Sequence, residues 1–349
     1  MLRQLPSPRT PDSREPPTLR WGILGTGWIA DEFVASLRAN TRQVVSAVGS
    51  RTPESAQRTA ARWGVDTAHG SYEALVADPQ VDVVYVATPH NFHLPHALLA
   101  ISAGKHVLIE KPVGLDAAEA TAIGEAAAAA GVFCMEAMWT LFLPKFDVAR
   151  QVLEQGWLGP VRSVLADMGE WFEQDHRIMR ADLAGGPLLD LGTYPITFAT
   201  WAIGAPDQVA AVATPAPNGI NGQLSIALAT ATGATASLQC TTLADTPETA
   251  CIAGTDGRLD VGRVFYRPGP LSVVLRDGQV LEWDEPAVAH GALHFEAAEV
   301  ARRITAGETG SPLRPWSETV ATLQVMDRVR DAVGLDFAEA RAARNAALG

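Results

Sequence analysis

Three side chains offer proton-transfer chemistry in this sequence. Lys111 stands at the end of a strand-like apolar run, one residue after Glu110, so it is either a functional amine or a lysine whose stem is buried while its ammonium reaches water. Asp190 and Tyr194 are four residues apart and would share one face of a helix. A lysine ammonium beside a tyrosine favours the phenolate, which makes the phenol a usable acid or base for a hydroxyl or carbonyl group. The alternative is a core tyrosine, with Asp190 capping a helix.

A glycine turn lies between a short apolar run and a helical pattern, in the stretch LRWGILGTGWIA. Gly25 permits a tight turn, Gly27 lets the backbone approach a pyrophosphate, and the free N–H groups of the following helix face its negative charge. Ala30 allows close packing of helix and strand. An ordinary strand-to-helix turn is the alternative. The context predicts a dinucleotide site with contacts from Gly25, Thr26, Gly27, Trp28 and Ile29.

The end of the second predicted strand, Val44–Gly49, indicates which dinucleotide binds. An acidic residue there would bond the ribose 2′-hydroxyl of NAD, and this chain has none in the segment VGSRT. Ser50 and Arg51 suit a 2′-phosphate instead, because arginine supplies charge and a planar fork. We therefore predict that NADP(H) is preferred, with NAD(H) as the alternative, although Arg51 could also be a surface residue beside an ordinary turn.

Two further predicted strands, Val81–Ala87 and His106–Ile109, end in polar turns at the sheet edge where the nicotinamide half would lie. These turns add the following cofactor-binding candidates: Thr88, Pro89, His90, Asn91, His93, Glu110, Lys111 and Pro112. The histidines at 90, 93 and 96 have a spacing that could cluster on a helical turn, but Pro95 interrupts it and no carboxylate or thiol partner is evident. No metal is predicted.

Aromatic residues could line a substrate pocket, since both sugar rings and aromatic rings stack on such faces. Trp139, Trp171 and Phe172 are the candidates, and core packing is their alternative interpretation. The predicted substrate-binding residues are Lys111, Trp139, Phe172, Asp190 and Tyr194.

Residues 19–138 alternate between strand and helix patterns, which predicts an α/β fold: a Rossmann domain with a doubly wound parallel sheet. Residues 139–349 contain many short strands with hairpin turn signals, which predict an α+β domain for substrate binding and dimerisation, with a large, mostly antiparallel open sheet. Residues 1–18 are rich in proline and lack an apolar segment, so we expect a disordered tail.

The composition excludes several classes. The formal net charge of −12 over 349 residues argues against a nucleic-acid partner, which needs a basic surface. No apolar run reaches the length of a membrane span, and no signal-peptide pattern precedes the first domain, so we expect a cytoplasmic protein without a membrane partner. The three cysteines are too scattered for a disulfide scaffold or a zinc site.

Four segments together resemble the glucose–fructose oxidoreductase/inositol dehydrogenase/MocA (Gfo/Idh/MocA) family: GTGWIA, ATPHNFHLPHALLAISAGKHVLIEKPVGLDAAEA, MEAMWTLFLP and GGPLLDLGTYPI. The chain is most similar to the branch of dimeric dihydrodiol dehydrogenases and NADP-dependent D-xylose dehydrogenases. The resemblance extends from about Leu19 to the C-terminus. It departs at Leu141, where members of the branch often have arginine, and this change bears on the identity of the substrate.

The resemblance implies roles for the three reactive side chains. Tyr194 would be the acid or base, Lys111 would modulate it, and Asp190 would bind a substrate hydroxyl or join a polar network. The implied activity is hydride transfer between NADP and a CH–OH carbon of a sugar, such as D-xylose, or of a cyclic trans-dihydrodiol. The implied assembly is a homodimer or higher homo-oligomer through the C-terminal sheet. The alternatives are a non-catalytic NADP-binding sensor or scaffold and an NAD-dependent glycoside hydrolase.

Overall fold

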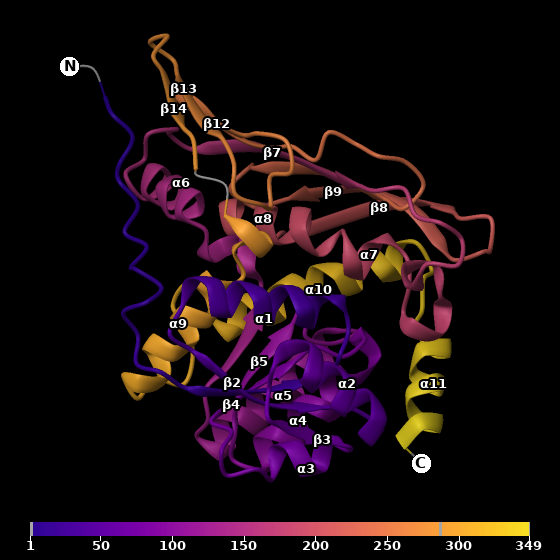
Figure 1. Ribbon diagram of the computed structural model, residues 1–349. Coiled ribbons are helices and arrows are strands. Elements are labelled where there is room, and N and C mark those ends of the chain that lie inside the picture. The colour runs from indigo at the N-terminus through magenta and orange to yellow at the C-terminus, as the bar shows by residue number, and fades with distance from the viewer. Residues whose placement is uncertain (1–2, 286–287, 349) are drawn as a thin grey trace. The chain divides into compact units, whose positions relative to one another are not determined.

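A computed structural model describes residues 3–285 and 288–348 (Figure 1). Met1, Leu2 and Gly349, which belong to the predicted tail and second domain, lie outside the described residues. The described chain forms two compact units. The parallel-sheet unit comprises residues 11–142 and 288–320, and the mixed-sheet unit comprises residues 3–10, 143–285 and 321–348.

The parallel-sheet unit contains, within its described residues, a six-stranded sheet of order β3-β2-β1-β4-β5-β6 in which every paired neighbour is parallel. Its strands are β1 (Arg20–Leu24), β2 (Val44–Gly49), β3 (Thr67–His69), β4 (Val83–Val86), β5 (His106–Glu110) and β6 (Cys134–Ala137). All four residues of β4 are buried, as expected for a central parallel strand. The predicted doubly wound sheet is confirmed, and β3 is a short strand that the sequence did not indicate.

The helices of this unit begin at residues that explain their position. Its helical segments are α1 (Trp28–Asn40), α2 (Pro53–Trp63), α3 (Tyr72–Val76), η1 (His90–Phe92), α4 (His93–Ser102), α5 (Ala117–Ala130), η2 (Trp139–Phe142), η5 (Ala289–Ala292) and α9 (His294–Thr305). Thr52, Ser71 and Asp116 cap α2, α3 and α5, because each side-chain oxygen accepts a backbone N–H of the first turn. Helix α1 begins at Gly27 without a side-chain cap, which leaves its first N–H groups for a ligand.

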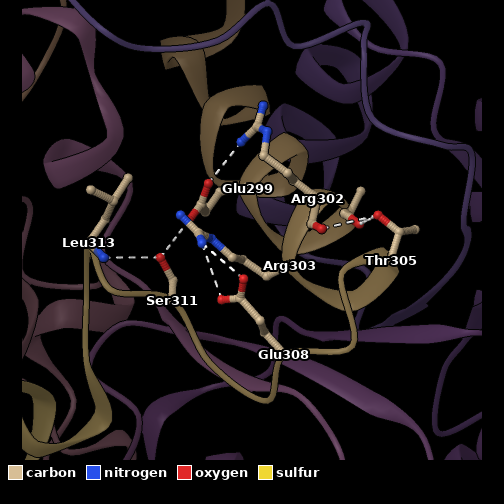
Figure 2. A network of polar contacts seen from close by, with 8 residues as sticks. Glu299, Arg302, Arg303, Thr305, Glu308, Ser311 and Leu313 are labelled. Atoms are coloured by element: carbon tan, nitrogen blue, oxygen red, sulfur yellow. Dashed lines mark hydrogen bonds and ion pairs between the residues drawn. The ribbon is translucent and has the colours of Figure 1, made fainter.

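A polar network fixes the segment that follows α9 (Figure 2). Glu299 accepts hydrogen bonds from Arg303 Nε at 2.7 Å, Arg302 Nη1 at 2.8 Å and Ser311 Oγ at 2.7 Å. Arg303 also pairs with Glu308 at 3.1 Å, which closes the turn. This segment packs within the parallel-sheet unit, although the predicted second domain includes it.

The mixed-sheet unit contains, as far as the structure describes it, an eight-stranded sheet of order β14-β13-β12-β11-β7-β10-β9-β8. Its strands are β7 (Val161–Gly169), β8 (Gln208–Pro215), β9 (Asn221–Ala229), β10 (Thr235–Thr241), β11 (Ala250–Gly254), β12 (Gly257–Val261), β13 (Leu271–Leu275) and β14 (Val280–Trp283). Neighbouring strands are antiparallel except for the parallel pair β7 and β10, so the predicted mostly antiparallel sheet is confirmed.

Helix α8 (Thr193–Ile203) covers one face of this sheet (Figure 1). The strands alternate accordingly: Leu224, Ile226 and Leu228 of β9 are buried, whereas the residues between them are less covered. The other helical segments of the unit are α6 (Pro144–Glu154), η3 (Arg177–Met179), η4 (Ala181–Leu183), α7 (Pro187–Asp190), α10 (Trp316–Ala332, which starts in the parallel-sheet unit) and α11 (Ala338–Leu348).

The described residues of the N-terminal segment, for which the sequence predicted a disordered tail, include a turn at residues 13–16 and make side-chain contacts. Within the mixed-sheet unit, Arg9 forms an ion pair with Asp147 at 2.7 Å and another with Glu154 at 3.2 Å. Within the parallel-sheet unit, Ser13 Oγ donates to the carbonyl oxygen of Asn40 at 2.7 Å. A proline-rich chain has few N–H groups for a helix or sheet, so side chains supply the attachment. In the described part of the chain, no helix is both long and apolar enough to span a membrane.

Candidate functional site

The turn between β1 and α1 is shaped for close approach of a ligand. Gly25 has φ +118°, and a Cβ atom there would lie 2.6 Å from the carbonyl oxygen of Ala87, so only glycine fits. A Cβ atom at Gly27 would meet no atom within 4 Å, so this backbone faces open space at the uncapped end of α1. Of the flanking candidates, Thr26 and Ile29 are half-buried and Trp28 is exposed. This cradle fits the pyrophosphate of a dinucleotide.

The end of β2 carries a guanidinium group and no carboxylate. Ser50 is buried, and its N–H donates to the carbonyl oxygen of His69 at 3.1 Å. Arg51 is exposed, and its charge acts on Tyr72 and His96. Burial, with a smaller contribution from neighbouring charges, lowers the pKa of His96 to about 4, so this neighbour is uncharged at neutral pH. Arg51, and not His96, therefore supplies positive charge at the end of β2.

His93 joins the turns that follow β4 and β5. Its ring is buried, with Nε2 2.7 Å from the carbonyl oxygen of Thr88 and Nδ1 2.7 Å from that of Pro112. The Lys111–Pro112 peptide bond is cis. The neighbouring candidates Pro89, His90 and Asn91 lie in the same turn, where His90 and Asn91 are also buried. His93 thus positions two turns that were predicted to bind the cofactor.

Glu110, the last residue of β5, fixes the start of the turn that carries Lys111. It is buried and accepts hydrogen bonds from the Tyr85 hydroxyl and, at 3.1 Å, from the backbone N–H of Lys111. Burial raises the pKa of Glu110. Lys111 itself is half-buried at the carboxyl end of β5. Tyr85 was missed by the sequence reasoning because it stands inside an apolar run that reads only as a buried strand.

Asp190 and Tyr194 lie on two short helices rather than on one. Helix α7 ends at Asp190 and α8 begins at Thr193, with the turn residues Leu191 and Gly192 between them. Arg177 binds the Asp190 carboxylate through both terminal nitrogens, at 2.9 and 3.4 Å.

The Tyr194 ring packs against that of Tyr266, with ring centroids 4.7 Å apart. Sequence reasoning missed both Arg177, in the three-residue helix η3, and Tyr266, in the connection between β12 and β13, since neither segment carries a local pattern. Their distance along the chain from Asp190 and Tyr194 hides the contact.

The remaining candidates divide between the two units. Lys111 and Trp139 belong to the parallel-sheet unit, where Trp139 is buried in η2 beside the equally buried Leu141. Phe172, Asp190 and Tyr194 belong to the mixed-sheet unit. The ring of Phe172 stacks on that of His176, with ring centroids 4.7 Å apart. The grouping of these residues in one site stays a prediction. Over the described ranges, no group of three or more His, Cys, Asp or Glu residues is arranged to hold a metal ion.

The chain has a parallel six-stranded sheet with a glycine turn shaped for a pyrophosphate, and a second, mixed sheet. This combination is typical of two-domain oxidoreductases that bind a dinucleotide. The family model described as "Oxidoreductase family, NAD-binding Rossmann fold" matches residues 19–138, and the Gfo/Idh/MocA C-terminal domain model matches residues 146–260. The chain belongs to the Gfo/Idh/MocA oxidoreductase family, as the sequence motifs indicated. Its first domain is an NAD(P)-binding Rossmann domain.

Named relatives cover nearly the whole chain. Trans-1,2-dihydrobenzene-1,2-diol dehydrogenase of Mus musculus is 35% identical over 91% of this chain and 98% of its own length. D-xylose 1-dehydrogenase (NADP(+)) of Hypocrea jecorina is 33% identical over 94% of this chain and 95% of its own length. A 3-ketoreductase from Actinomadura kijaniata, solved with NADP and TDP-benzene, is 28% identical with a TM-score of 0.80, over 91% of this chain and 98% of that protein.

Proposed function

We propose that this chain is an NADP-dependent dehydrogenase for a CH–OH carbon of a sugar, such as D-xylose, or of a cyclic trans-dihydrodiol. The observation that carries the proposal is the similarity, over more than nine-tenths of the chain, to dehydrogenases named for substrates of both kinds. The positioned Lys111 turn and the Arg177-bound Asp190 supply the polar groups that such a reaction needs.

Tyr194 is the proton-transfer group in this proposal. Its phenolic oxygen accepts the proton of the substrate hydroxyl during oxidation and returns it during reduction. The Lys111 ammonium stabilises the phenolate, and Asp190, held by Arg177, binds a neighbouring substrate hydroxyl. A bound nicotinamide supplies hydride transfer, and the residues of this chain orient the substrate carbon toward it.

The direct test is turnover of the purified chain with NADP⁺ or NAD⁺ and a panel of D-xylose, D-glucose, inositols and trans-dihydrodiols. Tyr194→Phe and Lys111→Ala should each lower kcat by about 100-fold or more, the size of a lost acid–base contribution, while cofactor binding persists. Fluorescence titration of NADPH checks that persistence. Full turnover by both variants would contradict the roles, whereas cofactor binding without turnover on any substrate would favour a sensor or scaffold. Aglycone release from a glycoside without net cofactor reduction would favour a glycoside hydrolase.

The preference for NADP rests on Arg51. Its exposed guanidinium follows β2 in a segment without a carboxylate, and can form two charge-assisted hydrogen bonds to a 2′-phosphate. Arg51→Asp should shift the ratio of kcat/KM for NADP⁺ over NAD⁺ by about 100-fold toward NAD⁺, since it replaces an attractive charge by a repulsive one. An unchanged ratio would refute the assignment.

We further propose a homodimer, formed through the sheet face that α8 leaves uncovered, and a cytoplasmic location. Leu165 of β7 and Val212 of β8 are 51% and 69% exposed, so this sheet carries apolar side chains that a second copy could cover. Leu165→Glu should convert the dimer to a monomer in sedimentation analysis, because a twofold interface would bring the new charge together with its copy. A wild-type monomer at micromolar concentration would refute the dimer, and recovery of the native protein outside the cytoplasmic fraction would refute the location.

A further inference from the structure

A polar cavity lies in the mixed-sheet unit, at the end of strand β7. Figure 1 labels this strand. Its volume is about 220 Å³, and three chain segments form it: the end of β7, the connection from β10 to β11, and the connection from β12 to β13. The cavity is lined by polar side chains that could contact a ligand, including those of Glu170, Thr246, Glu248, Arg263, Tyr266 and Arg267.

Two buried oxygen atoms line this cavity without a partner. Glu248 is 7% exposed, and neither its Oε1 atom nor Thr246 Oγ1 has a hydrogen-bond partner among the described residues. Buried polar groups in folded proteins are nearly always hydrogen-bonded, because losing water without replacement is costly. A ligand in the cavity would supply the missing bonds to both atoms.

The backbone around the cavity is held in a conformation that these residue types rarely adopt. Glu248 and Val264 both have φ +55°, in the left-handed region, and a β-branched residue there is a clear outlier. Asp167 of β7 maintains this conformation by accepting the N–H of Glu248 at 2.8 Å and that of Thr249 at 3.1 Å. Strain that the surrounding structure enforces is typical of ligand sites. Here its result is that the Glu248 carboxyl lies at the cavity.

The other polar groups combine donors and acceptors. Tyr266 donates its hydroxyl to Glu170 at 3.1 Å, which fixes that carboxylate at the cavity wall. Arg263 and Arg267 are exposed and line the same cavity, and the part of the chain that is described gives neither guanidinium a hydrogen-bond partner. A ligand that both donates and accepts hydrogen bonds matches this mixture, and the hydroxyl group is the smallest that does so.

We propose that this cavity binds hydroxyl groups of the substrate that are remote from the reacting carbon, so that the substrate of this chain is a sugar or other polyol. The carboxylates disfavour an anionic ligand, and an apolar ring would leave Glu248 and Thr246 unpaired. The inference rests on the proposed function, because it takes Tyr194 as the reacting group. Tyr266 connects the cavity with the proposed reacting group, since its ring packs on that of Tyr194 and its hydroxyl donates a hydrogen bond to Glu170 in the cavity wall.

The test compares two substrates in the purified full-length enzyme. D-xylose has hydroxyls beyond the reacting carbon, whereas trans-1,2-dihydrobenzene-1,2-diol has only one besides the reacting group. Thr246→Val and Glu248→Gln should each lower the ratio of kcat/KM for D-xylose over the diol by tenfold or more, mainly through KM. Thr121→Val, on the exposed face of α5, is the matched control and should keep the wild-type ratio. An equal fall with both substrates, or an unchanged ratio, would overturn the inference while the proposed function stands.

Equilibrium binding separates the inference from the proposed function. Saturation-transfer NMR of D-xylose on the wild-type chain should show binding that Thr246→Val and Glu248→Gln weaken by tenfold or more, whether or not cofactor is reduced. Turnover of neither substrate by the wild type would refute the proposed function alone. Absence of D-xylose binding to the wild type, or equal binding to the variants, would overturn the polyol site.

Discussion

Glu136 in the parallel-sheet unit and Glu248 in the mixed-sheet unit are both buried carboxyl groups, but their surroundings differ. Glu136 accepts three hydrogen bonds, from Arg314 Nε at 2.8 Å, Arg314 Nη2 at 2.7 Å and Thr319 Oγ1 at 3.1 Å. Glu248 has an oxygen that no described residue satisfies, next to an open cavity. The first carboxylate belongs to the scaffold, and the second is available to a ligand.

Glu296 shows that a missing partner alone does not make a ligand site. Both of its carboxyl oxygens are buried on α9 without a partner in the described chain, and the residue is fully enclosed. Burial, together with the nearby Glu110 and Glu136 carboxylates, raises the pKa of Glu296 well above its ordinary value, which favours the protonated, neutral form. What distinguishes Glu248 as a ligand-binding carboxyl group is therefore the cavity beside it, and not its unpaired oxygen.

The largest expected effect comes from breaking the Glu136 pair. Arg314→Met should lower the free energy of unfolding by about 3–5 kcal/mol, because it leaves an uncompensated buried charge. Urea unfolding monitored by tryptophan fluorescence measures the change. Arg258→Met, which breaks the exposed pair with Asp260, is the control and should cost at most about 0.5 kcal/mol. A loss below about 1 kcal/mol for Arg314→Met would mean that Glu136 is no better held than a surface carboxylate.

Replacing Glu296, the enclosed carboxyl group, should raise the free energy of unfolding instead of lowering it. Glu296→Met should raise the free energy of unfolding by about 1–3 kcal/mol at pH 7, because a desolvated carboxyl without partners is replaced by an apolar side chain of similar size. Since the folded pKa lies above the unfolded one, the folded state holds the extra proton, and wild-type stability falls as the pH rises above about 4.5 by at most ~1.4 kcal/mol per pH unit. The gain from Glu296→Met should therefore widen as the pH rises above about 4.5. The exposed Glu125→Met is the control.

Replacing Glu248 should give a gain in the free energy of unfolding that levels off as the pH rises. Burial and the Glu170 carboxylate, with a smaller contribution from Asp167, raise the pKa of Glu248 to about 7, while Arg267 and Arg263 oppose the shift. Wild-type stability therefore falls as the pH rises from about 4.5 to 7 and is constant above that range. Glu248→Gln removes this fall, so its advantage should reach about 1–3 kcal/mol at pH 8 and vanish below pH 4.5. A gain that keeps growing to pH 9 would contradict the levelling expected for a carboxyl group whose pKa is about 7.

The sequence predicted the parts of this molecule whose signals are local. The glycine turn at Gly25 and the alternation of strands and helices depend on neighbours within a few residues, and both agree with the structure. Strand β3 was missed because three residues carry too little pattern. Tyr266 and Glu248 could not be found, since their roles depend on Tyr194 and Glu170, which lie in distant parts of the chain.

The smallest effect concerns Arg9, which binds its carboxylates at the surface. Its side chain is about half exposed, and it pairs with Asp147 at 2.7 Å and Glu154 at 3.2 Å. Because water and salt screen exposed charges, Arg9→Ala should lower the free energy of unfolding by at most about 1 kcal/mol, and by still less in 1 M NaCl. Arg14→Ala, in the same segment but bonded to the backbone carbonyl of Ala39, is the control and should show no comparable salt dependence. A salt-independent loss as large as that of Arg314→Met would mean that the N-terminal segment, like Glu136, is part of the enclosed scaffold.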